Sequence, residues 1–409
     1  MPFIKLAFAL AAIVVSQDEF KERRTRLRAV VPDAAIVLIG STDQDADARR
    51  PYLQDPNFLY FTGWNEPGAV MILTPQEETI FLPPRSERKE RYEGRRAAPG
   101  DDGIERRTGF AKVLSSDIWE AELRRHSAAG LRIYTSKTSR KLPLIQAAVP
   151  GIELHDLTRE AARLRMSKSE RELELLQRAI DVSIDMHLAA WKRARAGLYE
   201  YQIEGTMFAS LKERGCERMA YHPIIGSGPN GVILHYSANQ RRMDRGELLL
   251  MDVGAECGHY AADLTRTVPV SGKFNERQRE LYEIVLGAQN AAIAATRPGA
   301  TLGPQGTLTN IARDYMNAHG KDLHGQPLGK YFTHGIGHHV GLEVHDAWNS
   351  DAPLAAGMVV TIEPGLYIPE EGIGIRIEDM VLVTADGAKV LSSKLPRQRK
   401  DIERLLGAR

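Results

Sequence analysis

The segment 247–269, with the sequence ELLLMDVGAECGHYAADLTRTVP, constrains the fold more than any other part of this chain. Its apolar residues flank Cys257-Gly258, where the glycine can take the positive φ of a tight turn, so the segment predicts two antiparallel strands. Asp252 then lies directly opposite Asp263, with Cβ atoms about 4.5–5.5 Å apart on one face. Two carboxylates this close repel each other unless a cation or a shared proton compensates. In the alternative interpretation, one aspartate caps a turn and the other is exposed.

A second pair of strands is predicted in the segment 361–379, TIEPGLYIPEEGIGIRIED. If residues 369–372 form the loop, Glu363 lies opposite Glu378. Between the two hairpins in sequence, HGIGHHVGLEVHD at 334–346 is rich in histidine and glycine. The alternative is that this stretch packs as a tight loop and that both glutamates are exposed strand residues.

Four carboxylates and one imidazole at a single site carry a large negative charge. Two divalent cations neutralise this charge, whereas a single divalent cation leaves part of it uncompensated. Such oxygen-dominated sites suit Mn²⁺, with Co²⁺ and Zn²⁺ as alternatives. Paired metals about 3.5–4 Å apart lower the pKa of a shared water and stabilise both oxygens of a tetrahedral intermediate. The two hairpins therefore predict a dinuclear metal hydrolase.

Length and composition place this site in an ordinary globular protein. A chain of 409 residues exceeds the usual size of a single core, so two domains are expected. A net charge of +1 gives no reason to expect nucleic acid or an anionic membrane as a partner. Cys216 and Cys257 form no CxxC motif and predict no disulfide framework, so they leave the redox compartment open.

The N-terminus predicts an export signal. Lys5 precedes an uninterrupted apolar run at 6–15, which is too short to span a bilayer and has the length of a signal-peptide core. We therefore expect a signal peptide at 1–16, export to the periplasm and no stable membrane insertion. The alternative is a cytoplasmic protein in which this run is a buried first strand or helix.

The remaining patterns divide the chain near residue 156. Residues 17–156 alternate short helices with apolar strands, predicted at Ala34–Ile39, 58–61 and 69–73, as in an α/β domain. Residues 157–194 predict helix, with Ser167 and Glu170 as a capping box. Further helices are predicted at 276–294 and 308–318. Residues 157–409 thus form an α+β domain of helices and hairpins.

These motifs resemble those of the pita-bread (creatinase-like) metallopeptidases, most closely the aminopeptidase P and prolidase branch. The resemblance covers nearly all of the chain after the leader. PYLQDPNFLYFTGWNEPGAVMIL at 51–73 and EGRR at 93–96 resemble the N-terminal domain of that branch, and RMSKSERELELLQRA at 165–179 resembles the start of its catalytic domain. The spacings D-x10-D, HGxGHxxGLxVHD, TxEPGLY and GIRIED also match in order. The resemblance implies a pita-bread catalytic domain preceded by a smaller α/β domain.

The resemblance also implies which residues bind the metals. The five ligands would be Asp252, Asp263, His338, Glu363 and Glu378. Asp263 and Glu378 would bridge the two ions. His338 holds the family position in HGxGH, whereas the neighbouring His339 is expected behind the ligands or at the surface.

Two histidines and Glu363, together with Arg376 described below, are the expected catalytic residues beside the metals. His235, in LHYSANQ, and His345 match family histidines that line the site, where they would hydrogen-bond the scissile carbonyl or the leaving nitrogen. The alternative for each is a structural histidine that holds a loop. Glu363 would relay a proton to the leaving nitrogen.

Three further residues complete the implied site. Arg376 lies two positions before Glu378 and would pair with a bridging carboxylate or with Asp252. His334 would line the pocket for the second substrate residue. Tyr367 would flank a proline ring, although an aromatic residue in a strand is more often part of the core.

The implied activity is hydrolysis, by a metal-bridging hydroxide, of the bond between an N-terminal residue and a penultimate proline, in a homodimer or homotetramer. The first alternative is an Xaa-Pro dipeptidase. That enzyme would be expected to carry a basic residue for the substrate carboxylate, which the insert after Asp346 lacks. The second is a metal-free pita-bread binding protein, but such relatives lack several of the five ligands, and none is missing here.

Overall fold

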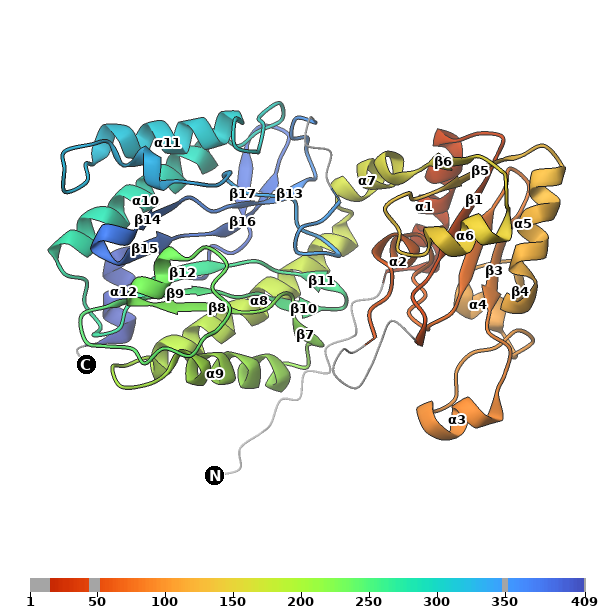
Figure 1. The fold of residues 1–409 in the computed structure, drawn as a ribbon, viewed down its shortest axis with the longest axis horizontal. Helices are drawn as coiled ribbons and strands as arrows, with labels where there is room; N and C mark the ends of the chain where they lie inside the picture. The colour runs from red at the N-terminus through yellow and green to blue at the C-terminus, as the bar shows by residue number, and fades with distance from the viewer. Residues whose placement is uncertain (1–14, 44–51, 348–351, 408–409) are drawn as a thin grey trace, which may run out of the picture. The chain divides into compact units, whose positions relative to one another are not determined.

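The computed structural model describes residues 15–43, 52–347 and 352–407, so most of the expected signal peptide lies outside it. The chain divides into two compact units, which meet in sequence between Arg165 and Met166 (Figure 1). The sequence patterns place the boundary at about 156–165, with residues 17–156 assigned to the first domain. In the structure helix α7, Thr158–Met166, still belongs almost entirely to the first unit.

The N-terminal unit is built on a six-stranded mixed sheet in the order β4-β3-β2-β1-β5-β6. β1 is buried along its whole length and runs antiparallel to β2 and parallel to β5. The predicted strand at β1 is therefore confirmed. The strands are β1 Ala34–Ile39, β2 Val70–Leu73, β3 Glu78–Leu82, β4 Lys112–Ser115, β5 Arg132–Thr135 and β6 Leu154–Asp156. The helices before α7 are α1 Gln17–Val30, α2 Pro56–Thr62, α3 Glu87–Glu93, α4 Ile104–Thr108, α5 Trp119–Ala128 and α6 Leu142–Ala148.

The strand predicted at 58–61 is wrong, because these residues belong to helix α2. The side chain of Asp55 accepts a hydrogen bond from the amide of Phe58 at 2.9 Å, Pro56 occupies the first turn, and Gly63 ends the helix with φ of 64°. These are the capping residues that start and stop a helix. They outweigh the strand preference of the aromatic residues between them.

The C-terminal unit, which begins at Met166, is called the catalytic unit below. Its strands lie between helices α8 and α9 on one side and α10 and α11 on the other (Figure 1). The helices are α8 Glu170–Arg193, α9 Glu200–Glu213, α10 Glu276–Ala295, α11 Thr307–His319 and α12 Arg399–Leu406. The strands are β7 Arg218–Met219, β8 Ile224–Ser227, β9 Leu248–Asp252, β10 Ala255–Cys257, β11 Tyr260–Ala261, β12 Thr265–Pro269, β13 Val359–Ile362, β14 Gly365–Ile368, β15 Ile373–Arg376, β16 Asp379–Val383 and β17 Ala388–Val390.

The helix predictions hold in this unit, with one correction. The capping box of α8 is formed by Ser169 and Glu172, not by Ser167 and Glu170. Ser167 instead bridges Met358 in an isolated β-pair, so the last residues before α8 are extended.

The register of the first hairpin differs from its prediction by two residues. Asp252 at the end of β9 lies opposite Thr265, not Asp263. The turn falls at Gly258-His259, where φ is 59° and 68°, because a type I′ turn needs positive φ at both central residues. A shift by two residues keeps each side chain on its original face, so both aspartates still point to one side.

The register of the second hairpin is confirmed. Gly365 lies opposite Arg376 in the β14–β15 pair, and Ile362 lies opposite Asp379 in the β13–β16 pair. Glu363 and Glu378 stand between these two pairs in the same alignment. The loop contains a short 3₁₀ turn, Pro369–Glu371, and Gly372 with φ of 61°.

The two cysteines, for which the sequence predicts no disulfide framework, are paired in the structure. Cys216 and Cys257 form a disulfide across a sequence separation of 41 residues, with Cα atoms 4.7 Å apart. Sequence spacing does not reveal this pair, because the contact arises only when α9 and the first hairpin pack together.

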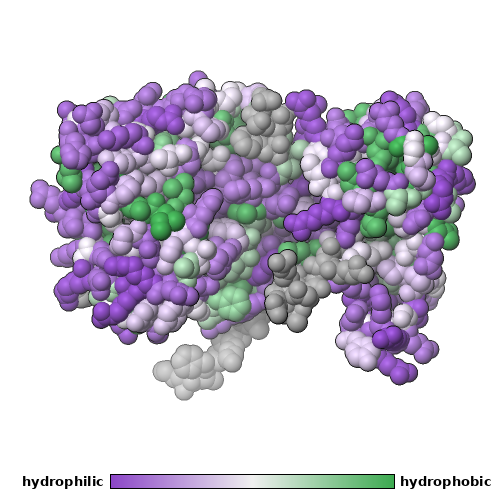
Figure 2. Space-filling view, in the orientation of Figure 1, coloured by the Kyte–Doolittle hydropathy of each residue, from purple (hydrophilic) through white to green (hydrophobic). Residues whose placement is uncertain are grey.

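The surface of the catalytic unit drawn in Figure 2 is mainly hydrophilic, with apolar side chains gathered in small patches. Among the helices that the structure describes, none is both long and apolar enough to cross a bilayer.

Candidate metal centre and active site

One cavity of about 520 Å³ in the catalytic unit collects every residue that the sequence analysis assigned to the site. These residues come from the loop after β8, the two hairpins and the glycine-rich stretch between them. The lining includes His235, Asp252, Asp263, His334, His338, His345, Glu363, Tyr367, Arg376 and Glu378.

The expected ligands converge within this cavity. Ligand atoms of Asp263, His338 and Glu378 lie within 4.8 Å of one another. Nε2 of His338 lies 3.4 Å from Oδ2 of Asp263 and 3.4 Å from Oε1 of Glu363. Nδ1 of His338 faces the carbonyl of His339 at 3.1 Å and carries a hydrogen, so Nε2 is the nitrogen that can bind a metal once it has lost its own proton.

The electrostatics of these residues fit divalent cations. Burial raises the pKa of Asp263 and of Glu378, and neighbouring carboxylates raise both further. Burial is also the main reason that the pKa of Glu363 is raised to about 7. Burial alone would lower the pKa of His338, but its hydrogen bond to Asp263 and the nearby acidic charges raise it to about 9. Buried carboxylates this crowded need positive charge, which bound cations supply.

Arg376 supplies part of that charge, as expected for a partner of Asp252. Its Nη2 donates to Oδ2 of Asp252 at 2.6 Å, and its Nη1 donates to the hydroxyl of Tyr367 at 2.8 Å. Nδ1 of His334 faces the carbonyl of Gly335 at 2.8 Å and must therefore carry the hydrogen. Nε2 of His334 then accepts from the Tyr367 hydroxyl at 2.9 Å. The side chains expected to bind substrate thus form one chain with Arg376.

The histidines of the cavity differ in their surroundings. Burial, followed by the charge of Arg376, lowers the pKa of His334 to about 4. Burial and then the charge of His338 lower the pKa of His345 to about 4. Both are therefore neutral at neutral pH. His339 is fully buried, so the surface position allowed for it is excluded.

Three residues of the site escaped the sequence analysis. The hydroxyl of Tyr221 lies 2.5 Å from Oδ1 of both Asp252 and Asp263 and donates its single hydrogen to one of them at a time. Thr265 donates to Oε2 of Glu378 at 2.6 Å. Nε2 of the buried His187 lies 3.3 and 3.2 Å from the carbonyls of the residues that follow the two aspartates, Val253 and Leu264. The register shift reveals Thr265, but no motif marks the other two.

Hairpins that present carboxylates to one cavity, packed against long helices and preceded by an α/β unit, define the pita-bread class of metallopeptidase. The family model of metallopeptidase family M24 matches residues 174–385, and that of the aminopeptidase P N-terminal domain matches residues 20–134. The chain belongs to metallopeptidase family M24.

Relatives resemble the chain over nearly its full length. It is 34% identical to the Xaa-Pro aminopeptidase of Haemophilus influenzae, over 95% of this chain and 97% of the relative. It is 32% identical to that of Escherichia coli, over 96% and 98%. The structure of aminopeptidase P from E. coli with the inhibitor Pro-Leu superposes with a TM-score of 0.85 at 29% identity, covering 96% of this chain and 98% of that chain.

Proposed function

We propose that this protein is an Xaa-Pro aminopeptidase, which hydrolyses the bond between an N-terminal residue and a penultimate proline. The observation that carries the proposal is the convergence of all ten expected side chains on one cavity. The full-length similarity to Xaa-Pro aminopeptidases supports the same activity.

The proposed metal centre comprises Asp252, Asp263, His338, Glu363 and Glu378. Four carboxylates with one imidazole favour Mn²⁺ over metals that prefer thiolates. When bound, two such ions lower the pKa of a water and polarise the scissile carbonyl.

The protein's own residues then orient the substrate and move protons. Glu363 lines the cavity beside the other ligands, so its carboxylate can take a proton from the attacking water and pass it to the proline nitrogen as that nitrogen leaves. The neutral His345 and His235 both line the cavity, where they can donate hydrogen bonds to the carbonyl oxygen as it gains charge. Ile224, Leu234 and Val344 give the cavity an apolar lining that suits a proline ring.

Cleavage of Arg-Pro-Pro-type tripeptides, compared with Gly-Pro and Ala-Pro dipeptides, tests this proposal. We expect Mn²⁺-dependent release of the first residue from the tripeptides and its loss with a chelator. Turnover of the dipeptides alone would instead indicate a prolidase. That alternative is supported by the Xaa-Pro dipeptidase of Pyrococcus furiosus, which is 40% identical over 56% of this chain. Inactivity on both classes would favour a binding protein.

We further propose export through the N-terminal apolar run at 6–15. The Cys216–Cys257 disulfide supports an oxidising compartment, because cytosolic thiols are normally kept reduced. Cell fractionation, with N-terminal sequencing of the mature protein, tests this assignment. Recovery of the uncleaved chain in the cytosol with two free thiols would contradict it.

A homodimer or homotetramer is the proposed assembly, by resemblance to the family. Light scattering during size-exclusion chromatography tests it, and elution with the mass of one chain would contradict it.

A further inference from the structure

We infer that the Cys216–Cys257 disulfide positions the metal centre by holding Tyr221 against Asp252 and Asp263. Cys216 follows α9, and Cys257 ends β10 just before the hairpin turn. Both are buried. The inference rests on the proposed metal site, but not on the identity of the peptide substrate.

The bridge lies at one end of a short ladder, and the two aspartates lie at the other. Beside the bridge, the amide of Glu217 donates to the carbonyl of Glu256 at 3.2 Å. β7 then pairs with β10, with Met219 opposite Ala255. Next the amide of Ala220 donates to the carbonyl of Gly254 at 2.9 Å. The following residue is Tyr221, so the ladder from the bridge leads directly to the hydroxyl between the aspartates.

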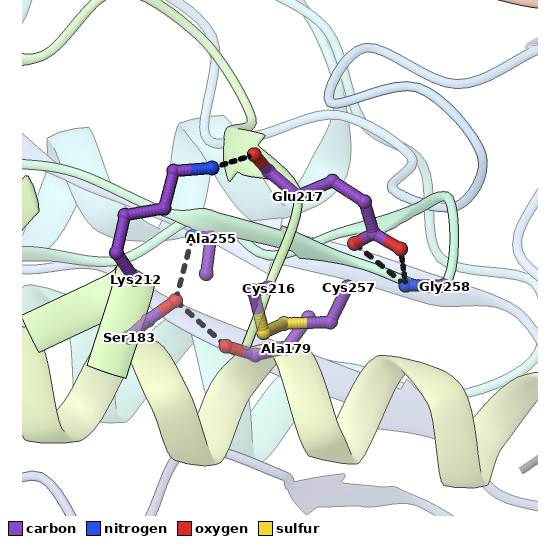
Figure 3. The surroundings of a disulfide bond; sticks show 8 residues. All are labelled: Ala179, Ser183, Lys212, Cys216, Glu217, Ala255, Cys257 and Gly258. Atoms are coloured by element: carbon purple, nitrogen blue, oxygen red, sulfur yellow. Dashed lines mark hydrogen bonds between the residues drawn. A yellow bond between two sulfur atoms is a disulfide. The ribbon is translucent and has the colours of Figure 1, made fainter. Parts of the chain in front are cut away.

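The two sides of this ladder are held very differently. The hairpin is tied to α8, because the amide of Ala255 donates to Oγ of Ser183 at 2.8 Å and the hydroxyl of Tyr260 donates to Glu172 at 2.8 Å (Figure 3 shows the Ser183 contact). β7 is an edge strand of two residues that pairs only with β10 among the described strands. β7 is therefore held to its three-stranded sheet along one side only. The disulfide is a covalent tie across this ladder, beside the ion pair between Arg218 of β7 and Glu256 of β10.

Glu217 strengthens the same junction. Its carboxylate accepts from the amide of Gly258 at 3.1 and 3.0 Å, and its carbonyl accepts from Lys212 (Figure 3). These contacts keep the end of α9 beside the hairpin turn, but they are exposed to water and so contribute less than buried contacts. Without the bridge we expect β7 to fray while the hairpin stays on α8.

Fraying of β7 withdraws the hydroxyl that orients Asp252 and Asp263. Both carboxylates present Oδ1 to Tyr221, while Oδ2 of Asp252 binds Arg376 and Oδ2 of Asp263 faces His338. Residues that orient metal ligands typically change metal affinity about 10- to 100-fold when they are removed. The expected consequence is weaker metal binding by an otherwise folded protein.

The test is calorimetric titration of the metal-free protein with Mn²⁺, in the wild type and in the double variant Cys216→Ala/Cys257→Ala. We expect the Kd for Mn²⁺ to rise about tenfold in the double variant, with kcat restored by excess Mn²⁺ and KM for peptide unchanged. Ile402→Ala, in the buried face of α12, is the control, because it lowers stability without touching the ladder. A merely structural disulfide would lower the melting temperature and leave the Kd unchanged, which would overturn the inference.

Tyr221→Phe shows whether the bridge acts through the tyrosine. Removing the bridge from this variant should weaken Mn²⁺ binding no further, because non-additive losses identify coupled residues. Fully additive losses would overturn the inference. If wild type does not bind Mn²⁺, the metal site itself fails; if it binds Mn²⁺ without cleaving peptides, only the proposed substrate fails.

If the double variant does not fold, wild type reduced by a water-soluble phosphine serves in the same titration. The phosphine takes the oxygen of one water and becomes its oxide, while the bridge gains two hydrogens and becomes two thiols. An unchanged Kd in the reduced protein would again overturn the inference.

Discussion

Tyr221 and Thr265 each bind carboxylates of the metal site, although neither belongs to a metal-binding motif. Their positions show that side chains outside the motifs help to orient the ligands, while burial and neighbouring carboxylates raise the pKa of Asp263 and of Glu378. These buried carboxylates, together with the buried His187, determine how the activity and the stability of the protein respond to mutation and to pH.

Asp263→Ala is expected to abolish turnover and to lower Mn²⁺ binding, because Asp263 is central to the ligand cluster. The metal-free variant should be at least as stable as metal-free wild type, since it lacks a buried carboxylate whose pKa is raised by burial and by Asp252. Peptide assays and thermal unfolding check both results. Residual activity near the wild-type level would refute a dinuclear mechanism.

His187 is expected to make stability depend on pH. Burial, and then the charge of Arg266, lowers its pKa to about 4 in the folded state, against 6.5 for an unperturbed histidine. The unfolded chain therefore binds a proton below pH 6.5 that the folded protein does not bind. The stability present above pH 6.5 is lost as the pH falls towards 4, by about 1.4 kcal/mol per pH unit.

His187→Gln removes this dependence but keeps an amide that can donate to Val253 and Leu264. Between pH 7 and pH 5, metal-free wild type should lose about 2 kcal/mol more than the variant. Urea unfolding at both pH values measures the difference. Identical losses in the two proteins would show that His187 does not bind the proton.

Among the elements, β15 meets the 3₁₀ helix Gly228–Val232 so closely that Gly374 of β15 has no room for a side chain. A Cβ on Gly374 would lie 1.8 Å from the carbonyl oxygen of Gly231. The loop that carries His235 begins at this 3₁₀ helix, so the contact links strand packing to the position of a catalytic histidine.

Gly374→Ala is expected to lower the free energy of unfolding by about 1–3 kcal/mol, because it overpacks this contact. It should also lower kcat/KM by displacing His235, while metal content stays at the wild-type level. Gly205→Ala is the matched control: a Cβ there meets no atom within 4 Å in α9, so stability should rise by about 0.5–1 kcal/mol. Denaturant unfolding and peptide assays check both variants. An unaltered kcat/KM in Gly374→Ala would show that this contact does not affect catalysis.

For the molecule as a whole, metal binding and folding should be coupled, because the ligands come from strands and loops that only the folded catalytic unit brings together. Free Mn²⁺ at 100 times its Kd should raise the free energy of unfolding by about 2.7 kcal/mol, and chelator should remove that gain. Thermal unfolding with and without Mn²⁺ measures it. If the melting temperature did not depend on Mn²⁺, the idea that only the folded state binds the metal would be contradicted.

Features with a local cause could be predicted from the sequence. The strand Ala34–Ile39 is a continuous apolar run, and the second hairpin has a loop whose length determines which glutamates face each other. The motifs keep their order and spacing along the chain, so five candidate ligands could be named from their resemblance to those of a known family. In each case the information lies within about twenty residues.

Other features depended on contacts between distant segments, and only the tertiary structure decided them. The first hairpin turns at Gly258-His259, while Cys257 remains in β10 and bonds to Cys216, which lies outside the hairpin sequence. Tyr221 reaches Asp252 and Asp263 only because β7 pairs with β10. The sequence alone thus determined which side chains are the candidate ligands and what chemistry they offer, since those reside in residue type and spacing. The tertiary structure decided what holds them in place, because packing brings those partners together from separate parts of the chain.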